Sequence, residues 1–309
     1  MRSLLTAGVI AFLMAAGNCH AIIFYSTGST NFNTTTPAGL LANSGWQFQG
    51  NFGSVSGTPI APNFFITAKH IGGSIGSTFV FGGSTYTTTA FFDKNDPLDP
   101  GNDLRIWQVS GTFSTYAPLY TASNENGKSL VMFGRGTQRG SEVVLSGTSK
   151  GWQWGATDEV RRWGENEVAG IYDGGVLYGH SLLGMTFSST GGVNEGSYSE
   201  GDSGGGVFIS DGGVWKLAGV NSWADGPYGL TATPFLNSFN ASLFDQNGYY
   251  ANTLTSNWEV VNGPGLDYAT SISGSQAWIL SEIPEPSTFA LVSLSAIAGI
   301  SRSRSKRRR

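Results

Sequence analysis

The chain has 309 residues and a formal net charge of −4, with 45 glycines and a single cysteine. This length suffices for one large β core or two small ones, and the lone cysteine excludes a disulfide framework. Glycine stands at roughly double its usual share. Short runs rich in Thr, Val, Ile and aromatic residues accompany it, so the composition predicts an all-β protein of many strands and tight turns, a barrel or a sandwich.

The N-terminal segment has the pattern of a secretory signal. Arg2 precedes an apolar run that spans Leu4–Ala16, and small residues stand at Cys19 and Ala21, the two cleavage-site positions. We expect signal peptidase to remove residues 1–21 on export. The exported chain then has no cysteine, and packing alone has to stabilise it.

Two strand-like runs bring a histidine and an aspartate to strand ends in the first half of the chain. Phe64–Ala68 is predicted to be a strand that delivers His70 just beyond its end. Leu104–Val109 is predicted to be a second strand, with Asp103 at its entrance.

Polar residues from about 121 to 128 divide the body of the chain into two β-rich halves of similar size. We place the first half at about 22–120 and the second, which opens on SLVMFGRGTQRG, at about 128–240. Residues 241–282 show no pattern that we recognise, and we treat them as an extension or spacer.

The stretch SYSEGDSGGGVFI places Ser203 in a glycine turn just before an apolar strand. Glycine lets other backbone groups approach closely, so this turn is expected to be crowded. A serine nucleophile needs a base that takes its proton and a carboxylate that orients the base. After export only His70 and His180 remain as histidines. His70 and Asp103 both stand at strand ends of the first half, so we take His70, Asp103 and Ser203 as the candidate set. Because the role of the base is then filled, His180 is expected to be a loop or surface histidine.

Five motifs together resemble the trypsin/chymotrypsin serine protease family. FFITAKH, NDLRIWQV, FGRGTQRG, EGDSGGGVF and LAGVNSW follow the family's order over roughly residues 22–240, and the pair around His70 and Ser203 is specific. The resemblance implies two six-stranded-type β-barrels with the active site between them. It also implies a serine endopeptidase that acts on proteins or peptides through an acyl-enzyme. The sequence indicates neither a cofactor nor a metal site.

The resemblance also implies the role of each residue. Ser203 would attack the scissile carbonyl, His70 would take and return the proton, and Asp103 would orient His70. The backbone N–H groups of Gly201 and Ser203 would form the oxyanion hole, in which one donor typically contributes about 3 kcal/mol.

A further implied feature is an ion pair behind the nucleophile. In the family, the aspartate at the position of Asp202 pairs with a new α-ammonium group created by cleavage. Removal of the signal would create such a group at Ile22, which is apolar enough to enter a buried pocket. We therefore hypothesise that signal peptidase alone activates the protein. Against this, Phe24 and Tyr25 replace the flexible glycines that usually follow.

Selectivity for the side chain just before the scissile bond (P1) is indicated by a few positions. By resemblance, the base of the P1 pocket corresponds to Ser197, and one wall corresponds to Ser222, Trp223 and Ala224. Because Ser197 is not a carboxylate and Ala224 replaces the usual glycine, we expect uncharged, small to medium apolar P1 residues. Attraction of basic side chains by Glu200 and Asp225, which flank the pocket, is the alternative.

The C-terminal residues 283–309 have the composition of a sorting tail. Pro284-Glu285-Pro286 precedes an uncharged run to Ile300, which is shorter than the ~20 residues of a membrane span, and a basic cluster follows. This closely resembles the PEP-CTERM tail of Gram-negative bacteria, which implies removal by an exosortase-type enzyme at the inner membrane. We expect the protein at the cell surface or outside the cell. A permanent tail anchor is the alternative.

Charge and context separate the rival functions. Residues 22–282 hold 10 of the 17 Lys and Arg and 20 of the 21 Asp and Glu, a net charge near −10, so no nucleic-acid partner is expected. A non-catalytic surface or matrix-binding protein on a protease scaffold is the main alternative.

An esterase that uses the same three residues is a second alternative. Its nucleophile elbow would require the chain order serine, acid, histidine, whereas the order here is His70, Asp103, Ser203. The segment GWQWGATDEVRRWGENEV is predicted to be an exposed hairpin, with a carbohydrate platform as the less favoured interpretation.

Overall fold

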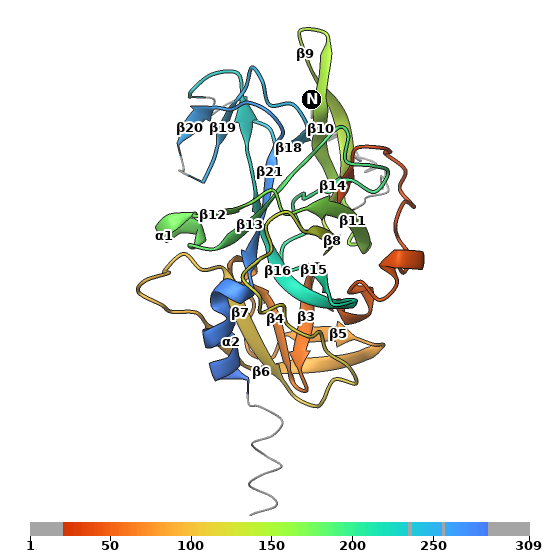
Figure 1. Ribbon diagram of the computed structural model, residues 1–309, viewed down its shortest axis with the longest axis vertical. Helices are drawn as coiled ribbons and strands as arrows, with labels where there is room; N and C mark the ends of the chain where they lie inside the picture. The colour runs from red at the N-terminus through yellow and green to blue at the C-terminus, as the bar shows by residue number, and fades with distance from the viewer. Residues whose placement is uncertain (1–20, 234–236, 255–256, 284–309) are drawn as a thin grey trace, which may run out of the picture.

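The computed structural model describes residues 21–233, 237–254 and 257–283, in which two β units are stacked along the long axis of the molecule (Figure 1). Apart from Ala21 and Ile283, the predicted signal and the predicted sorting tail lie outside the described residues. Within the described ranges, no helix is long and apolar enough to cross a bilayer.

The first unit is a closed antiparallel barrel with the strand order β2-β3-β4-β7-β6-β5. Aromatic side chains fill it, and the rings of Phe65 and Phe79 stack with centroids 3.9 Å apart. A side chain at Gly50 would put its Cβ 2.2 Å from the Phe79 ring, so this core requires glycine there. The strands are β2 (Gly50–Phe52), β3 (Val55–Ala61), β4 (Phe64–Ala68), β5 (Thr78–Phe81), β6 (Ser84–Asp93) and β7 (Leu104–Val109).

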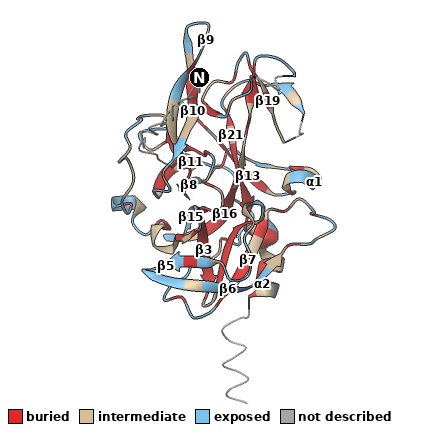
Figure 2. Ribbon diagram, turned by 180° about the vertical axis from the view of Figure 1, so that it is seen from behind, coloured by how far each residue is buried: buried red, intermediate tan, exposed pale blue. Residues whose placement is uncertain are grey.

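The second unit is a seven-stranded sheet, with the order β11-β8-β15-β16-β21-β13-β12, that curves into a half-barrel. Its central strands each contain a buried run, residues 206–209 of β15, 217–221 of β16 and 267–271 of β21 (Figure 2). The strands are β8 (Ser129–Gly134), β11 (Arg162–Glu167), β12 (Gly170–Tyr172), β13 (Leu182–Thr186), β15 (Gly206–Asp211), β16 (Val214–Ala224) and β21 (Leu266–Ser271).

Three small sheets and two short helices complete the described structure. The first sheet pairs β1 (Ile23–Phe24) with β14 (Gly196–Ser197). The second is a long hairpin of β9 (Thr137–Leu145) and β10 (Thr148–Thr157), extended by β18 (Ala241–Leu243). The third contains β17 (Tyr228–Gly229), β19 (Tyr250–Asn252) and β20 (Trp258–Val260). The helices are α1 (Gly175–Tyr178) and α2 (Gln276–Glu282).

The all-β prediction with two barrel-like units is confirmed. The segments at the two ends of residues 22–282, however, belong to other parts of the fold than the sequence predicted. β1, which was assigned to the first half, pairs with β14 of the second half. β21 lies inside the second sheet between β16 and β13, so residues 241–282 are not a spacer. α2 then lies beside β7 of the first barrel (Figures 1 and 2). The run LDYATS does not alternate apolar and polar residues, so the sequence does not mark it as a strand. It becomes a central strand because it pairs with β13 on one side and β16 on the other.

One apolar cluster joins the two units under the cleft between them. It includes Ile66 of β4, Phe133 of β8 and Phe208 of β15. Because His70 follows β4 and Ser203 precedes β15, this shared core fixes the separation of the two halves of the candidate site.

Candidate active site

His70 and Asp103 are neighbours because their strands are neighbours. β4 and β7 pair in antiparallel register, with Ala68 opposite Leu104. His70 lies in the 3-10 turn Lys69–Ile71 that follows β4. The Lys69 N–H donates to the backbone oxygen of Asp103 at 2.9 Å, so the turn is tied to the entrance of β7.

The three predicted side chains form one hydrogen-bonded chain. His70 Nε2 lies 2.9 Å from Ser203 Oγ, and His70 Nδ1 lies 2.6 Å from Asp103 Oδ2. The backbone N–H of His70 donates to Asp103 Oδ1 at 2.8 Å, and Ser222 Oγ donates to Asp103 Oδ2 at 2.7 Å. The carboxylate is therefore held from several sides, while the imidazole is 47% exposed and open to a substrate.

Asn221 holds the turn that carries the serine, a role that was not predicted from the sequence. Its Nδ2 donates to the backbone oxygens of Phe133 and Asp202, at 2.7 and 2.9 Å. Its own backbone oxygen accepts the N–H of Gly204 at 2.9 Å. The turn before β15 is thus pinned to β16 and β8, which places Ser203 Oγ against His70.

Gly201 has a backbone conformation that favours glycine in the turn that carries Ser203. Its φ is +90°, a conformation that L-residues with a side chain rarely adopt. No backbone carbonyl of the described residues accepts the N–H of Gly201 or of Ser203. The two predicted oxyanion donors therefore have no backbone partner in this part of the chain.

Asp202 is buried behind Ser203. Oδ1 accepts the N–H of Gly136 at 2.8 Å, and Oδ2 accepts the N–H and the hydroxyl of Ser199 at 2.8 and 2.9 Å. Oδ2 also lies 3.3 Å from the backbone nitrogen of Ile22, the residue that the sequence singled out as its partner. Burial raises the pKa of Asp202 to about 6, although these hydrogen bonds act to lower it.

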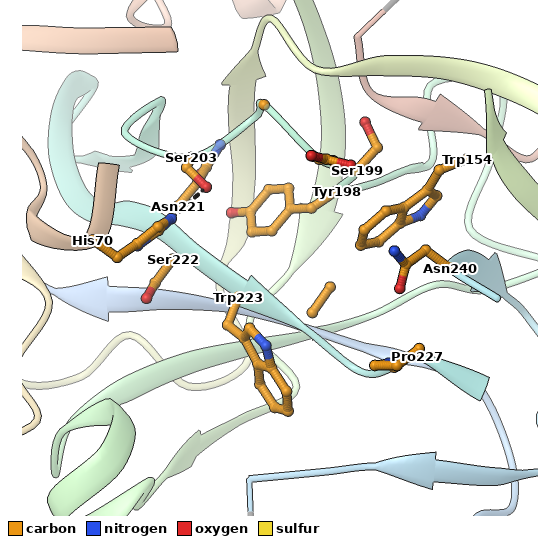
Figure 3. A pocket seen from close by; sticks show the side chains of 14 residues that line it. His70, Trp154, Tyr198, Ser199, Ser203, Asn221, Ser222, Trp223, Pro227 and Asn240 are labelled. Carbon is orange, nitrogen blue, oxygen red and sulfur yellow. Dashed lines mark hydrogen bonds between the residues drawn. The ribbon is translucent and has the colours of Figure 1, made fainter. Parts of the chain in front are cut away.

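A cavity of about 340 Å³ opens beside Ser203 and His70 (Figure 3). Ser222, Trp223 and Ala224 line one side, as expected, and residues 198–201 line the other. The other lining residues were not anticipated from the sequence: Trp154, Tyr198, Ser199, Asn221, Gly226, Pro227 and Asn240. They come from several separate segments, and Trp154, Pro227 and Asn240 lie outside every motif that carries the resemblance.

Two expected pocket residues do not line this cavity. Ser197, predicted as its base, is buried in β14, and its hydroxyl bonds Ser242 and Asp267 at 2.9 and 3.2 Å. Asp225 is also buried, and it accepts hydrogen bonds from Gln246 Nε2, the Leu266 N–H and Tyr268 OH. Both are occupied by protein groups, so the suggestion that Asp225 attracts basic side chains at the pocket is wrong.

Two other sequence features prove to be structural. Trp152 and Trp163 are buried, and so is Arg162, whose Nη2 donates to the backbone oxygen of Thr30 at 2.7 Å. The Trp-rich segment is therefore neither the fully exposed hairpin expected from the sequence nor an open aromatic platform. His180 lies at the surface, as expected, with Nδ1 2.7 Å from Asp173 Oδ1.

Comparison with known proteins identifies the scaffold. A family model described as Trypsin matches residues 41–237, more than half of the chain. The chain belongs to the trypsin family. Among solved structures, one described as "Atomic resolution structure of HBP" is similar at 17% identity, covering 79% of this chain and 95% of that chain, with a TM-score of 0.46. No curated protein matches. The family is one of serine protease hydrolases, whose substrates are proteins or peptides.

Proposed function

We propose that this protein is an exported serine endopeptidase with Ser203, His70 and Asp103 as its catalytic triad. The observation that carries the proposal is the unbroken chain from Ser203 Oγ through His70 to Asp103 Oδ2, with distances of 2.9 and 2.6 Å. A serine hydroxyl is a weak nucleophile unless an oriented base takes its proton, and this geometry meets that requirement.

The mechanism follows from the same atoms. Ser203 Oγ attacks the scissile carbonyl while His70 Nε2 accepts its proton, and Asp103 stabilises the imidazolium that forms. The Gly201 and Ser203 amides donate to the oxyanion. The tetrahedral intermediate then collapses: its C–N bond breaks, and His70 gives the proton to the leaving amine. Water, activated by His70, hydrolyses the acyl-enzyme and restores Ser203.

Two cavities that Trp223 helps to line support a polypeptide substrate. One is the 340 Å³ cavity, and the other, of about 640 Å³, lies between the His70 turn and α1. Val176 and Leu177 of α1 line the second cavity, and Tyr178 stacks on Trp223 with centroids 4.5 Å apart. An extended polypeptide that crosses Trp223 would reach both cavities. A small ester would need only one of them, so the second cavity favours a polypeptide substrate. The complete triad also argues against a non-catalytic binding protein.

Covalent labelling tests the proposal. A fluorophosphonate probe should react with Ser203 in the purified protein, because His70 activates the hydroxyl. The phosphoryl oxygen of the adduct can also accept hydrogen bonds from the N–H groups of Gly201 and Ser203. Labelling should disappear in Ser203→Ala. An unlabelled but folded wild-type protein would instead support the non-catalytic alternative.

The acid limb of the activity profile is expected to lie above pH 6.5. Burial lowers the pKa of His70, but the hydrogen bond to Asp103 and the negative charge of Asp103 raise it more, so the net shift is upward from 6.5. The base must be neutral, so kcat/KM rises as pH rises through this raised pKa. The midpoint of the acid limb is measured from a pH profile of kcat/KM. In Asp103→Asn the acid limb of the residual activity should lie at lower pH. A wild-type acid limb with its midpoint below pH 6.5 would contradict the assignment of His70 as the base.

We also propose that export activates the protein. Cleavage after Ala21 would turn the Ile22 nitrogen, 3.3 Å from Asp202 Oδ2, into an ammonium that neutralises a buried carboxylate. Such a pair raises the α-amino pKa above its free value of about 7.7–8.0. Its stabilisation is complete below the free value and is lost as pH rises through the raised one. Activity should therefore fall on the alkaline side independently of His70.

The proposed processing predicts both ends of the exported protein. Mass spectrometry should find Ile22 as the first residue, and a C-terminus that lacks the basic cluster if an exosortase-type enzyme removes the tail at the inner membrane. A variant with Gly-Ser ahead of Ile22 should lose most of its activity, since the ammonium is displaced from Asp202. Full activity of that variant would refute the activation step, and an intact Arg309 terminus would refute removal of the tail.

A further inference from the structure

The connection between β6 and β7 carries Asp103 at its end and a cluster of three buried polar side chains before it. The cluster contains Lys94, Asp99 and Asn102. Lys94 Nζ donates to Asp99 Oδ2 at 2.7 Å, and Asn102 Nδ2 donates to the same oxygen at 2.8 Å. Buried polar groups need such partners, so these bonds fix the path of the connection up to the residue before Asp103.

Asn102 fixes the main chain at Asp103. Its Oδ1 accepts the N–H of Leu104 at 3.2 Å, so its side chain reaches across Asp103 to the first residue of β7. An asparagine that bonds the main chain two residues further on sets a turn. Because its Nδ2 donates to Ser275 Oγ at 3.1 Å as well as to Asp99, this turn is anchored to a second segment.

The cluster also joins the two β units. Asp99 Oδ1 accepts the N–H of His180 at 2.9 Å, and His180 follows α1 of the second unit. A Cβ at Gly101 would lie 2.7 Å from the backbone nitrogen of Gly179, so the two main chains touch there. Figure 1 shows α1 beside this connection. Ser275 lies between β21 of the second sheet and α2. The start of β7 is therefore tied to the unit that carries the proposed nucleophile.

The charges of the cluster balance each other. Burial raises the pKa of Asp99, but its hydrogen bonds, chiefly those with Lys94 and Asn102, lower it more. Asp99 is therefore an anion beside a cation, and each has a partner. Breaking one half of such a buried pair is costly, so the cluster is a rigid connection rather than a source of net charge near His70.

We propose that Asn102 is a positioning residue, which holds the Asp103 carboxylate against His70 by tying the start of β7 to the second unit. The proposed nucleophile comes from the second unit, whereas His70 and Asp103 come from the first, so the triad needs a connection between the units on the carboxylate side. Asn102 bonds neither His70 nor Ser203 among the described residues, and it therefore acts through Asp103. The inference rests on the proposed endopeptidase function, since it concerns the same triad.

The test combines an NMR titration of the His70 ring, assigned with His70→Ala, with kcat for a peptide substrate, both on the full chain. In the wild type burial lowers the pKa of His70 and Asp103 raises it more, so the midpoint lies above 6.5. In Asn102→Ala the carboxylate is held less well. The His70 midpoint should fall toward 6.5, and kcat should fall about tenfold to hundredfold, the cost of displacing a catalytic group by about 1 Å. A loss of stability alone would leave the midpoint in place.

Asp96 provides a matched control in the same connection. Its Oδ1 accepts the N–H of Leu98 at 2.9 Å, the same kind of bond that Asn102 makes with Leu104. This bond does not reach across Asp103. Asp96→Ala should therefore keep the wild-type midpoint and kcat.

A second variant breaks the connection at its other end. Lys94→Met/Asp99→Leu removes both buried charges together, so that neither is left without a partner. It should lower the His70 midpoint as Asn102→Ala does, because Asn102 loses Asp99 as an acceptor.

The outcomes separate this inference from the proposed function. An unchanged His70 midpoint in folded Asn102→Ala, or an equal fall in Asp96→Ala, would overturn the inference. If Asn102→Ala does not fold, Ser275→Ala decides, because it removes only one acceptor of the same amide: a lowered midpoint supports the inference and an unchanged one overturns it. The midpoint is measured without turnover. Absence of fluorophosphonate labelling in the wild type would instead be the failure of the proposed function.

Discussion

Replacing Ser203 with alanine is expected to lower kcat by on the order of 10⁶, the loss typical of a triad serine. In the proposed mechanism the Ser203 hydroxyl forms the covalent bond to the substrate. The hydroxyl of Ser222, which also lies near this site, donates to Asp103 instead. His70→Ala should cost about as much, and the double variant should cost no more than either single one, because the two groups act as a unit. Cleavage of a peptide substrate measures all three.

His180 provides a matched control for the histidine. Its Nδ1 lies 2.7 Å from a carboxylate oxygen of Asp173, and its side chain is 42% exposed, close to the 47% of His70. It differs in having no serine hydroxyl as a partner among the described residues. His180→Ala should therefore retain activity. Equal turnover by wild type and Ser203→Ala would end the enzymatic interpretation.

Changing Asp103 to asparagine is expected to lower kcat by about 10⁴ near neutral pH, the size seen when a triad carboxylate becomes an amide. Asp103 accepts at both oxygens, from the His70 N–H, from Ser222 Oγ and from the His70 ring. An amide NH₂ turned toward the ring would favour the tautomer that carries its proton on Nε2. That nitrogen then cannot accept the proton of Ser203.

The corresponding control is Asp173→Asn, which makes the same chemical change beside His180. It should leave turnover unchanged, which separates the loss of an oriented base from a general effect of removing a surface carboxylate. Fluorophosphonate labelling should be slowed in parallel with turnover in Asp103→Asn, since both reactions need His70 as a base. A loss smaller than tenfold would contradict the role of Asp103.

The sequence alone determined the class of fold and indicated the three candidate catalytic residues. Glycine turns and short apolar runs are local signals, and they indicated an all-β chain. His70 and Asp103 stand beside the ends of strands that could each be predicted from their own residues. Ser203 stands in a turn whose glycines leave room for closely packed backbone. The chemistry requires those three residue types together, and the resemblance of the motifs around them to the trypsin/chymotrypsin family connected them.

Only the tertiary structure decided what surrounds those residues. β1 and β14 are joined across more than half the chain, and β21 is central because β13 and β16 pair with it, which no local pattern encodes. The pocket shows the reason most clearly. Ser197 and Tyr198 are consecutive, and successive side chains of an extended chain point in opposite directions. Long-range pairing alone set which of the two would face the cavity: the Ser197 hydroxyl bonds Asp267, and Tyr198 lines the cavity.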